Sequence, residues 1–174
     1  MATFTVTTFI NRPLQEVFDF MTNPANFAQW QSGTKSAKWA SEGPVGVGSI
    51  FHSVGQLLGR EMKMDLEITQ WSPPNVWGIK GGSGPMKFEG VSKFESKDGG
   101  TSVIQNFEGE VGGFFSIAEG LAIKQLQKQI ETDGNALKKL LEARISPGVA
   151  SPAIPVRCPR GMSELSNDII KLTM

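Results

Sequence analysis

His52 is the only histidine in this chain of 174 residues, and it is the first candidate for acid–base chemistry. The unperturbed pKa of an imidazole lies near about 6.5, which suits a general base at neutral pH. His52 falls in a predicted strand whose two faces are similarly apolar, so the alternation of side chains does not decide its orientation. It is a candidate catalytic base if it faces a ligand cavity, and an ordinary strand residue if it does not.

Asp65 and Glu67 form the second candidate group, because they lie two positions apart on another predicted strand. Such residues share one face of a strand at roughly 6 to 7 Å, a spacing that suits a pair of catalytic carboxylates. They alternate with Met64, Leu66 and Ile68, however, which is typical of a strand with one dry face and one wet face. We therefore interpret the two carboxylates as part of a solvated outer face.

The sequence gives little support for a metal site, a serine-hydrolase site or a phosphate-binding loop. One histidine and one cysteine, Cys158, form no metal-ligand spacing, so we expect no metal site and no cofactor. The serine-hydrolase motif Gly-x-Ser-x-Gly is absent from the sequence. Gly43, Gly46 and Gly48 match neither phosphate-binding glycine pattern, and we interpret them as turn residues.

An apolar pocket is better supported than a catalytic centre. Met62, Met64 and Leu66 share one face of a strand, and flexible thioethers adapt to irregular apolar ligands. Gln105 or Gln125 would supply the isolated polar group that orients a ligand. The predicted pocket residues are Trp30, Met62, Met64, Leu66, Trp77, Phe88, Gln105, Phe107, Phe114, Leu121 and Gln125.

The elements that would position these residues follow a clear order. A strand over 3–10 precedes a short helix with Asn11 as its expected cap and Pro13 in its first turn, and a second short helix ends at Trp30. A long amphipathic helix follows Gly112-Gly113 and runs from about 114 to 144, with Gly134 as a possible bend. Between them, alternation of period two predicts antiparallel strands near 35–41, 48–57, 60–71, 75–82, 86–96 and 101–110.

The composition limits the kinds of partner and the location that we expect for this protein. The 17 basic and 17 acidic residues are interspersed and sum to zero formal charge, which argues against a nucleic-acid partner. Apolar runs fall short of the roughly 18 residues of a membrane helix, the N-terminus lacks a signal-peptide pattern, and one cysteine cannot form an internal disulfide. We expect a cytoplasmic protein without membrane insertion.

Several short motifs follow one another along the chain: Arg12-Pro13 with Val17-Phe18 and Phe20, Asn23-Pro24 with Phe27 and Trp30, Gly48 with Phe51, Gly59-Arg60, Ser83-Gly84-Pro85, and Gly99-Gly100-Thr101 before the long helix. In the order and spacing of these motifs, the chain resembles the START-like, or SRPBCC, superfamily over about residues 3–143, specifically its polyketide cyclase/dehydrase and lipid transport branch. The resemblance implies an α+β helix-grip fold, also called Bet v 1-like: a curved antiparallel sheet of about six or seven strands around a long C-terminal helix, with two short helices after the first strand. It also implies a cavity for lipids, polyketides or other apolar molecules.

We expect a ligand-binding domain over 1–143 and a proline-rich tail over 144–174, with a short helix over 163–172. The leading hypothesis is the binding of a small hydrophobic ligand, for transport or sensing. One alternative is a cyclase, dehydratase or hydrolase that uses His52 or a buried carboxylate in the same cavity. Another is a non-catalytic interaction module in which the tail docks on a partner, such as the second subunit of a homodimer.

Overall fold

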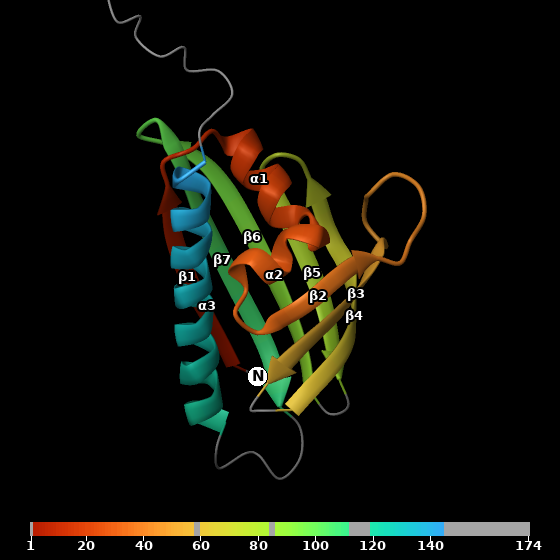
Figure 1. Cartoon of the computed structure of the whole chain (residues 1–174). Coiled ribbons are helices and arrows are strands. Elements are labelled where there is room, and N and C mark those ends of the chain that lie inside the picture. The colour runs from red at the N-terminus through yellow and green to blue at the C-terminus, as the bar shows by residue number, and fades with distance from the viewer. Residues whose placement is uncertain (1, 58–59, 84–85, 112–118, 145–174) are drawn as a thin grey trace, which may run out of the picture.

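The computed structural model of the chain describes residues 2–57, 60–83, 86–111 and 119–144, and Figure 1 labels the elements in them. One strand, a helical segment in three short parts, six further strands and a long helix follow one another. Their bounds are β1 Ala2–Ile10, α1 Leu14–Thr22, the 3-10 helix Pro24–Asn26, α2 Phe27–Trp30, β2 Thr34–Trp39, β3 Ile50–Leu57, β4 Arg60–Ser72, β5 Val76–Ser83, β6 Met86–Lys97, β7 Gly100–Val111 and α3 Glu119–Glu142.

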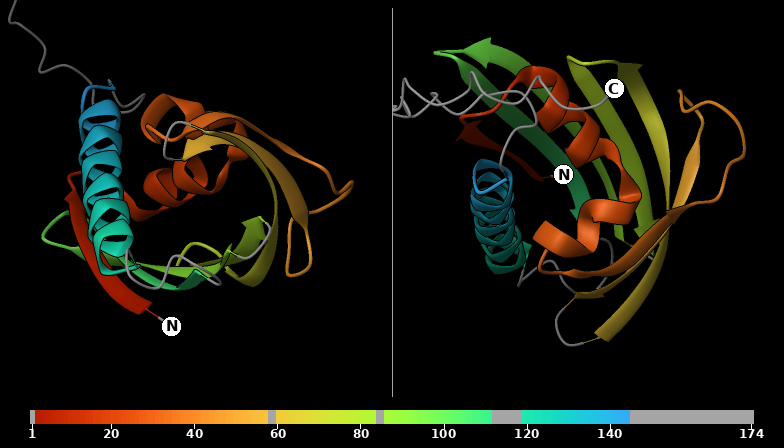
Figure 2. Two further views of the ribbon diagram at one scale, coloured as in Figure 1. Left: turned by 90° about the horizontal axis from the view of Figure 1, so that it is seen from below. Right: turned by 45° about the horizontal axis from the view of Figure 1, so that its top comes forward.

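The seven strands form one antiparallel sheet in the order β1-β7-β6-β5-β4-β3-β2. Strands β2 to β7 are consecutive neighbours, as short connections predict, whereas β1 pairs with β7 and forms one edge. Figure 2 shows that the sheet curves, with α1, α2 and α3 on its concave side. This arrangement is the helix-grip fold, and it confirms the predicted fold class.

The helix α1 begins directly after Pro13, whose fixed backbone suits the start of a helix. Its apolar face packs into the core through Val17, Phe18 and Met21, which are fully buried. The expectation that Asn11 caps this helix was wrong, because no side-chain hydrogen bond caps α1. Instead the Asn11 backbone N–H donates to Glu142 Oε1 at 2.8 Å, which joins the end of β1 to the end of α3.

The helix α3 packs against β1 and α2 (Figures 1 and 2). Leu137 and Leu141, one turn apart, are its fully buried apolar residues among those described. Gly134 does not interrupt the helix, which is continuous from Glu119 to Glu142. Because α3 contacts β1 at one edge of the sheet and α2 near the other, it closes the concave side of the sheet.

The core lies where α1 and α2 cross the concave face in the upper half of Figure 1. Phe18, Phe51 and Phe94 are its largest fully buried side chains. Phe18 and Phe94 pack edge to face with ring centroids 5.1 Å apart. Most of the fold's apolar burial is therefore at this end of the sheet.

The sequence placed every strand within two residues of its observed bounds. The long helix is observed from Glu119, and the predicted start at 114 lies outside the described residues. The tail over 145–174, with the helix predicted over 163–172, lies outside them as well. None of the helices in the described ranges is both long and apolar enough to cross a membrane.

Candidate ligand-binding site

The concave face of β4 carries the apolar row that the sequence predicts. Leu66 and Ile68 are buried there, and Met62 and Met64 continue the row as half-buried residues. Lys63, of opposite phase, is exposed on the convex face. This alternation assigns Met62, Met64 and Leu66 to the interior.

Strands β5, β6 and β7 continue this inner face through Trp77, Phe88, Gln105 and Phe107. Trp77 and Gln105 are buried, and Phe88 and Phe107 are half-buried. A Cβ atom at Gly90 would lie 2.9 Å from the Phe107 ring, so the glycine leaves the space that this ring occupies. The absence of a side chain at position 90 thus makes room for a large inward residue.

An aromatic cluster joins the short helix α2 to the sheet. Phe27 lies between Trp30 and Trp77, with ring centroids 6.1 Å and 6.0 Å away. Phe27 also packs against Phe51 at 5.5 Å, and Phe51 against Trp39 at 5.7 Å. These rings belong to the same buried core as Phe18 and Phe94.

The burial of the inner face changes along the strands. Towards α1 and α2, residues such as Phe94 and Ile68 are almost fully buried. Near the beginning of β4 and of β6, Met62, Met64 and Phe88 are only half-buried although they point inward. An inward apolar surface that the described residues do not fully cover is a candidate ligand surface.

One of the predicted pocket residues lies away from this surface, and two others fall outside the description. Gln125 is exposed on α3 and does not reach the buried inner face, which corrects its prediction as the polar group of the pocket. Phe114 lies outside the described residues, and the side chain of Leu121 is likewise outside the description. Gln105 is therefore the predicted polar residue that the structure places inside.

His52 lies on the convex face of β3, opposite Asp65 of β4. Its Nδ1 is 2.6 Å from Asp65 Oδ1, and the two side chains are 49% and 73% exposed. The prediction of His52 as a base inside the cavity is therefore wrong. Neighbouring side chains on a strand point to opposite faces, and Phe51 and Ser53 take the inward positions, so His52 points to solvent.

The carboxylates of β4 also face outward, as their interpretation as a solvated face predicts. Glu67 pairs with Lys80 of β5 at 3.1 Å, and both side chains are well exposed. Exposed ion pairs of this kind contribute little to stability. Asp65 and Glu67 do not form an acid–base pair in the interior.

Asp133 is the buried carboxylate of the described chain, and no sequence pattern singled it out. It lies on α3 and accepts a hydrogen bond from the Ser32 backbone N–H at 2.9 Å. Burial raises the pKa of Asp133 above its ordinary value, and the bond from Ser32 opposes this rise. The carboxylate thus ties α3 to the loop between α2 and β2.

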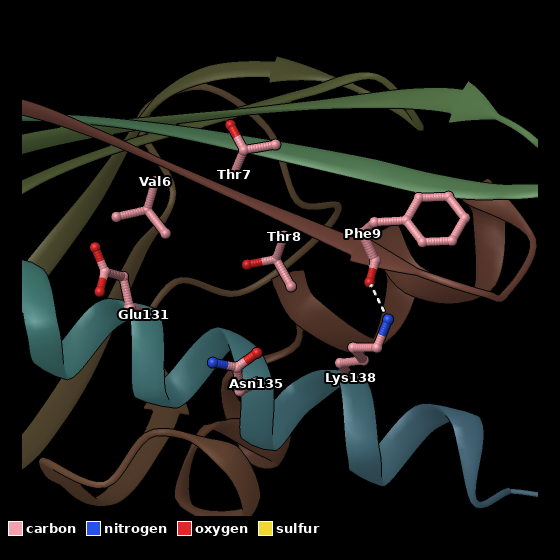
Figure 3. Close-up of a pocket in the computed structure, with 7 residues that line it drawn as sticks. All are labelled: Val6, Thr7, Thr8, Phe9, Glu131, Asn135 and Lys138. Atoms are coloured by element: carbon pink, nitrogen blue, oxygen red, sulfur yellow. Dashed lines mark hydrogen bonds between the residues drawn. The ribbon is translucent and has the colours of Figure 1, made fainter.

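A separate groove of about 330 Å³ lies between β1 and α3 (Figure 3). Lys138 crosses it and donates a hydrogen bond to the Phe9 carbonyl oxygen at 2.8 Å. Most of its lining is polar, which suits water better than an apolar ligand. The lining residues are Val6, Thr7, Thr8, Phe9, Glu131, Asn135 and Lys138.

Sequence reasoning missed two inward residues that belong with the predicted set. Phe27 is the centre of the aromatic cluster, and Ser92 lies between Trp77 and Gln105 in the register of the sheet. The sequence could have identified Ser92, because it lies an even number of residues from Phe88 and Phe94 on the same strand and so faces the same side. No group of three potential metal ligands gathers among the residues that the structure describes.

Solved structures with the same fold share little sequence with this chain. The protein TTHA0849 from Thermus thermophilus has a TM-score of 0.71 at 17% identity, covering 82% of this chain and 100% of that one. Ara h 8.0201 has a TM-score of 0.66 at 13% identity, covering 82% and 99%. The di-domain ARO/CYC protein BexL from the BE-7585A biosynthetic pathway has a TM-score of 0.66 at 19% identity; the match covers 83% of this chain and 51% of that one, about half its length.

A comparison with curated protein sequences found no match. A family model does match, and it spans residues 1–142, which is nearly all of the described fold. Its description is polyketide cyclase / dehydrase and lipid transport. Because this match covers most of the chain, and the helix-grip fold agrees with it, the chain belongs to the polyketide cyclase/dehydrase and lipid transport family.

Proposed function

We propose that this protein binds a small hydrophobic ligand, such as a lipid or a polyketide-like molecule, between the inner face of the sheet and α3. The observation that carries the proposal is the half-buried apolar surface of Met62, Met64, Phe88 and Phe107 on the concave face. Transport or sensing of the ligand would follow from reversible binding at this surface. The family description, which names both polyketide chemistry and lipid transport, supports either ligand class.

The residue types of this surface favour an apolar ligand of irregular shape. Met62 and Met64 have flexible, unbranched side chains that adapt to different contacts. Phe88 and Phe107 add rigid aromatic area on the neighbouring strands. Each methylene group that a ligand buries here is worth about 0.8 kcal/mol, so a ligand of moderate size binds without any charged contact.

Binding rather than catalysis is proposed because the candidate acid–base groups are engaged elsewhere. His52 lies on the convex face with Asp65. The Asp133 carboxylate is held by the Ser32 backbone N–H. His52 therefore does not face a ligand on the inner face, and Asp133 is bonded through Oδ1 to the loop between α2 and β2.

A matched pair of variants on β4 tests the proposal. Met64→Glu places a charge on the inner face, and Lys63→Glu places the same charge on the convex face one residue away. In titrations with an apolar fluorescent probe, we expect Met64→Glu to weaken binding at least about tenfold and Lys63→Glu to leave it within about twofold. Circular dichroism checks that both variants are folded. Equal affinities for the two folded variants would contradict the proposed site.

Denaturing mass spectrometry of the wild-type protein, purified without detergent, supplies an independent test. We expect a co-purified apolar molecule that is released on denaturation and is depleted in the Met64→Glu preparation. A molecule retained equally by Met64→Glu and wild type would place the binding site elsewhere.

A further inference from the structure

Two tryptophan side chains in the interior have hydrogen-bond donors without partners. Trp30 is 6% exposed and Trp77 is 4% exposed, and neither indole Nε1 has an acceptor among the described residues. Buried polar groups in folded proteins are nearly always hydrogen-bonded, so each such donor calls for an explanation. Thr69 has the third unpartnered buried side-chain atom of the described residues, but it lies at the irregular register of β4 and β5, away from the aromatic cluster.

The two indoles lie in one region of the interior. Trp30 and Trp77 flank Phe27, as the ring distances above show. Trp77 also begins a row across three strands, because Trp77 pairs with Ser92 and Ser92 with Gln105 in the register of the sheet. Neighbouring strands are about 4.8 Å apart, so this row spans about 10 Å of the inner face.

The row places two further polar side chains in the interior. Ser92 and Gln105 are both buried. Their exposed fractions are 5% and 7%. Four buried side chains with polar atoms therefore lie in this part of the interior: Trp30, Trp77, Ser92 and Gln105.

The charges of the interior indicate which ligand groups these donors suit. Indole N–H groups are neutral and can only donate. Asp133 is the one charged residue that is buried in the described part of the chain, and it is acidic. An ionised carboxylate or phosphate of a ligand would therefore lose its hydration here without gaining a cation, which is costly.

We propose that the ligand is a neutral molecule with a carbonyl or hydroxyl oxygen on an apolar body, and that Trp77 and Trp30 donate hydrogen bonds to its oxygen atoms. This inference rests on the proposed function and adds which chemical groups of the ligand the same site recognises. Ser92 and Gln105 extend the polar row toward β7 and accommodate a second oxygen of the ligand. The apolar body lies toward Met62, Met64 and Phe88.

Three naphthalenes of similar size test the inference on the full-length wild-type protein: the acetyl, ethyl and carboxyl derivatives. We expect the neutral ketone to bind about tenfold more tightly than the ethyl compound, since an indole donor gains an acceptor only with the ketone. The carboxylate is expected to bind more weakly than the ketone at neutral pH. Dissociation constants from titrations give both ratios directly.

Proton–nitrogen correlation spectra of the four tryptophan indoles show which donors respond. Relative to the ethyl compound, the ketone is expected to shift the Nε1–H signals of Trp30 and Trp77 downfield, and to leave those of Trp39 and Trp71 unchanged. Trp39 and Trp71 are half-buried controls on the same sheet. Phenylalanine variants assign the four signals.

Trp77→Phe and Trp30→Phe remove the donors while keeping an aromatic ring in the wall. In the double variant, we expect the preference for the ketone over the ethyl compound to fall to within about twofold, with the ethyl compound bound as before. Trp39→Phe is the matched control and keeps the preference. Equal binding of ketone and ethyl compound by the wild type, or tighter binding of the carboxylate, would overturn the inference and leave the proposed function standing. If none of the three compounds binds, both this inference and the proposed function fail.

Discussion

Gly134 of α3 lies so close to Thr8 of β1 that a Cβ atom on the glycine would be 2.5 Å from Thr8 Oγ1. This contact sets the distance between the long helix and the edge strand of the sheet. A side chain at position 134 would have to push α3 away from β1 or displace Thr8. The glycine that suggested a bend in the helix thus serves helix–strand packing.

Gly134→Ala tests this contact. Overpacking at a tight contact lowers the free energy of unfolding by about 1–3 kcal/mol, and the higher helix propensity of alanine raises it by about 1 kcal/mol. We expect a net loss of about 1 kcal/mol in the free energy of unfolding, measured with urea. In a Thr8→Ala background the clash is relieved, and the same substitution should stabilise the protein. A loss of equal size in both backgrounds would show that Thr8 is not the cause.

Arg12 supports the C-terminal end of α3. Its Nε donates to the Leu141 carbonyl oxygen at 2.8 Å, and its Nη2 to the Glu142 carbonyl oxygen at 3.3 Å. A cation is favourable at this end of a helix, and the last carbonyl groups lack partners within it. We expect Arg12→Gln to lower the free energy of unfolding by about 1–2 kcal/mol, with Arg12→Lys intermediate. Thermal unfolding of the two variants would contradict this role if both matched the wild type.

Asp133 should make stability depend on pH. Its pKa is raised in the folded protein, so folding favours the protonated form. The protonated carboxyl therefore stabilises the fold fully below the pKa that Asp133 has in the unfolded chain. This stabilisation is lost as the pH rises through the pKa that Asp133 has in the folded protein. Asp133→Asn keeps an acceptor for the Ser32 N–H and removes the charge. Relative to wild type, we expect this variant to gain stability as the pH rises from about 3 to about 7, measured by urea unfolding at each pH. A difference that stays constant over that range would rule out this origin.

His52 should be dispensable for ligand binding. It lies on the convex face in an exposed pair with Asp65, and such pairs are worth less than about 1 kcal/mol. We expect His52→Ala to leave the affinity for an apolar probe within about twofold of wild type, as should its matched partner variant Asp65→Ala. A loss of about tenfold in the affinity of His52→Ala alone would restore His52 as a site residue.

The architecture could be predicted from the sequence because its signals are local. Alternation in β4, from Met62 to Ile68, places apolar and charged residues on opposite faces without knowledge of the fold. The change from period two to helical period after 113 marks the start of the last element in the same way. Turn residues between the strands limit the order of pairing to antiparallel neighbours.

The orientation of single residues could not be predicted where the two faces of a strand are alike. His52 is the clearest case, because β3 alternates Ile50 and Val54 outward with Phe51 inward. The face was decided by pairing, since His52 lies opposite Asp65 on the solvated side of β4. Asp133 was missed for a similar reason: its burial comes from the α2–β2 loop, which is far away in sequence.

The central claim, that an apolar ligand lies on the inner face, is tested most directly by methyl NMR of protein labelled at its methionine methyl groups. With an apolar probe at saturation, we predict intermolecular nuclear Overhauser effects from the probe to the methyl groups of Met62 and Met64. The polar groove between β1 and α3, lined by Thr7 and Lys138, is the competing site (Figure 3). Saturable binding with contacts to that groove, and none to Met62 or Met64, would contradict the account.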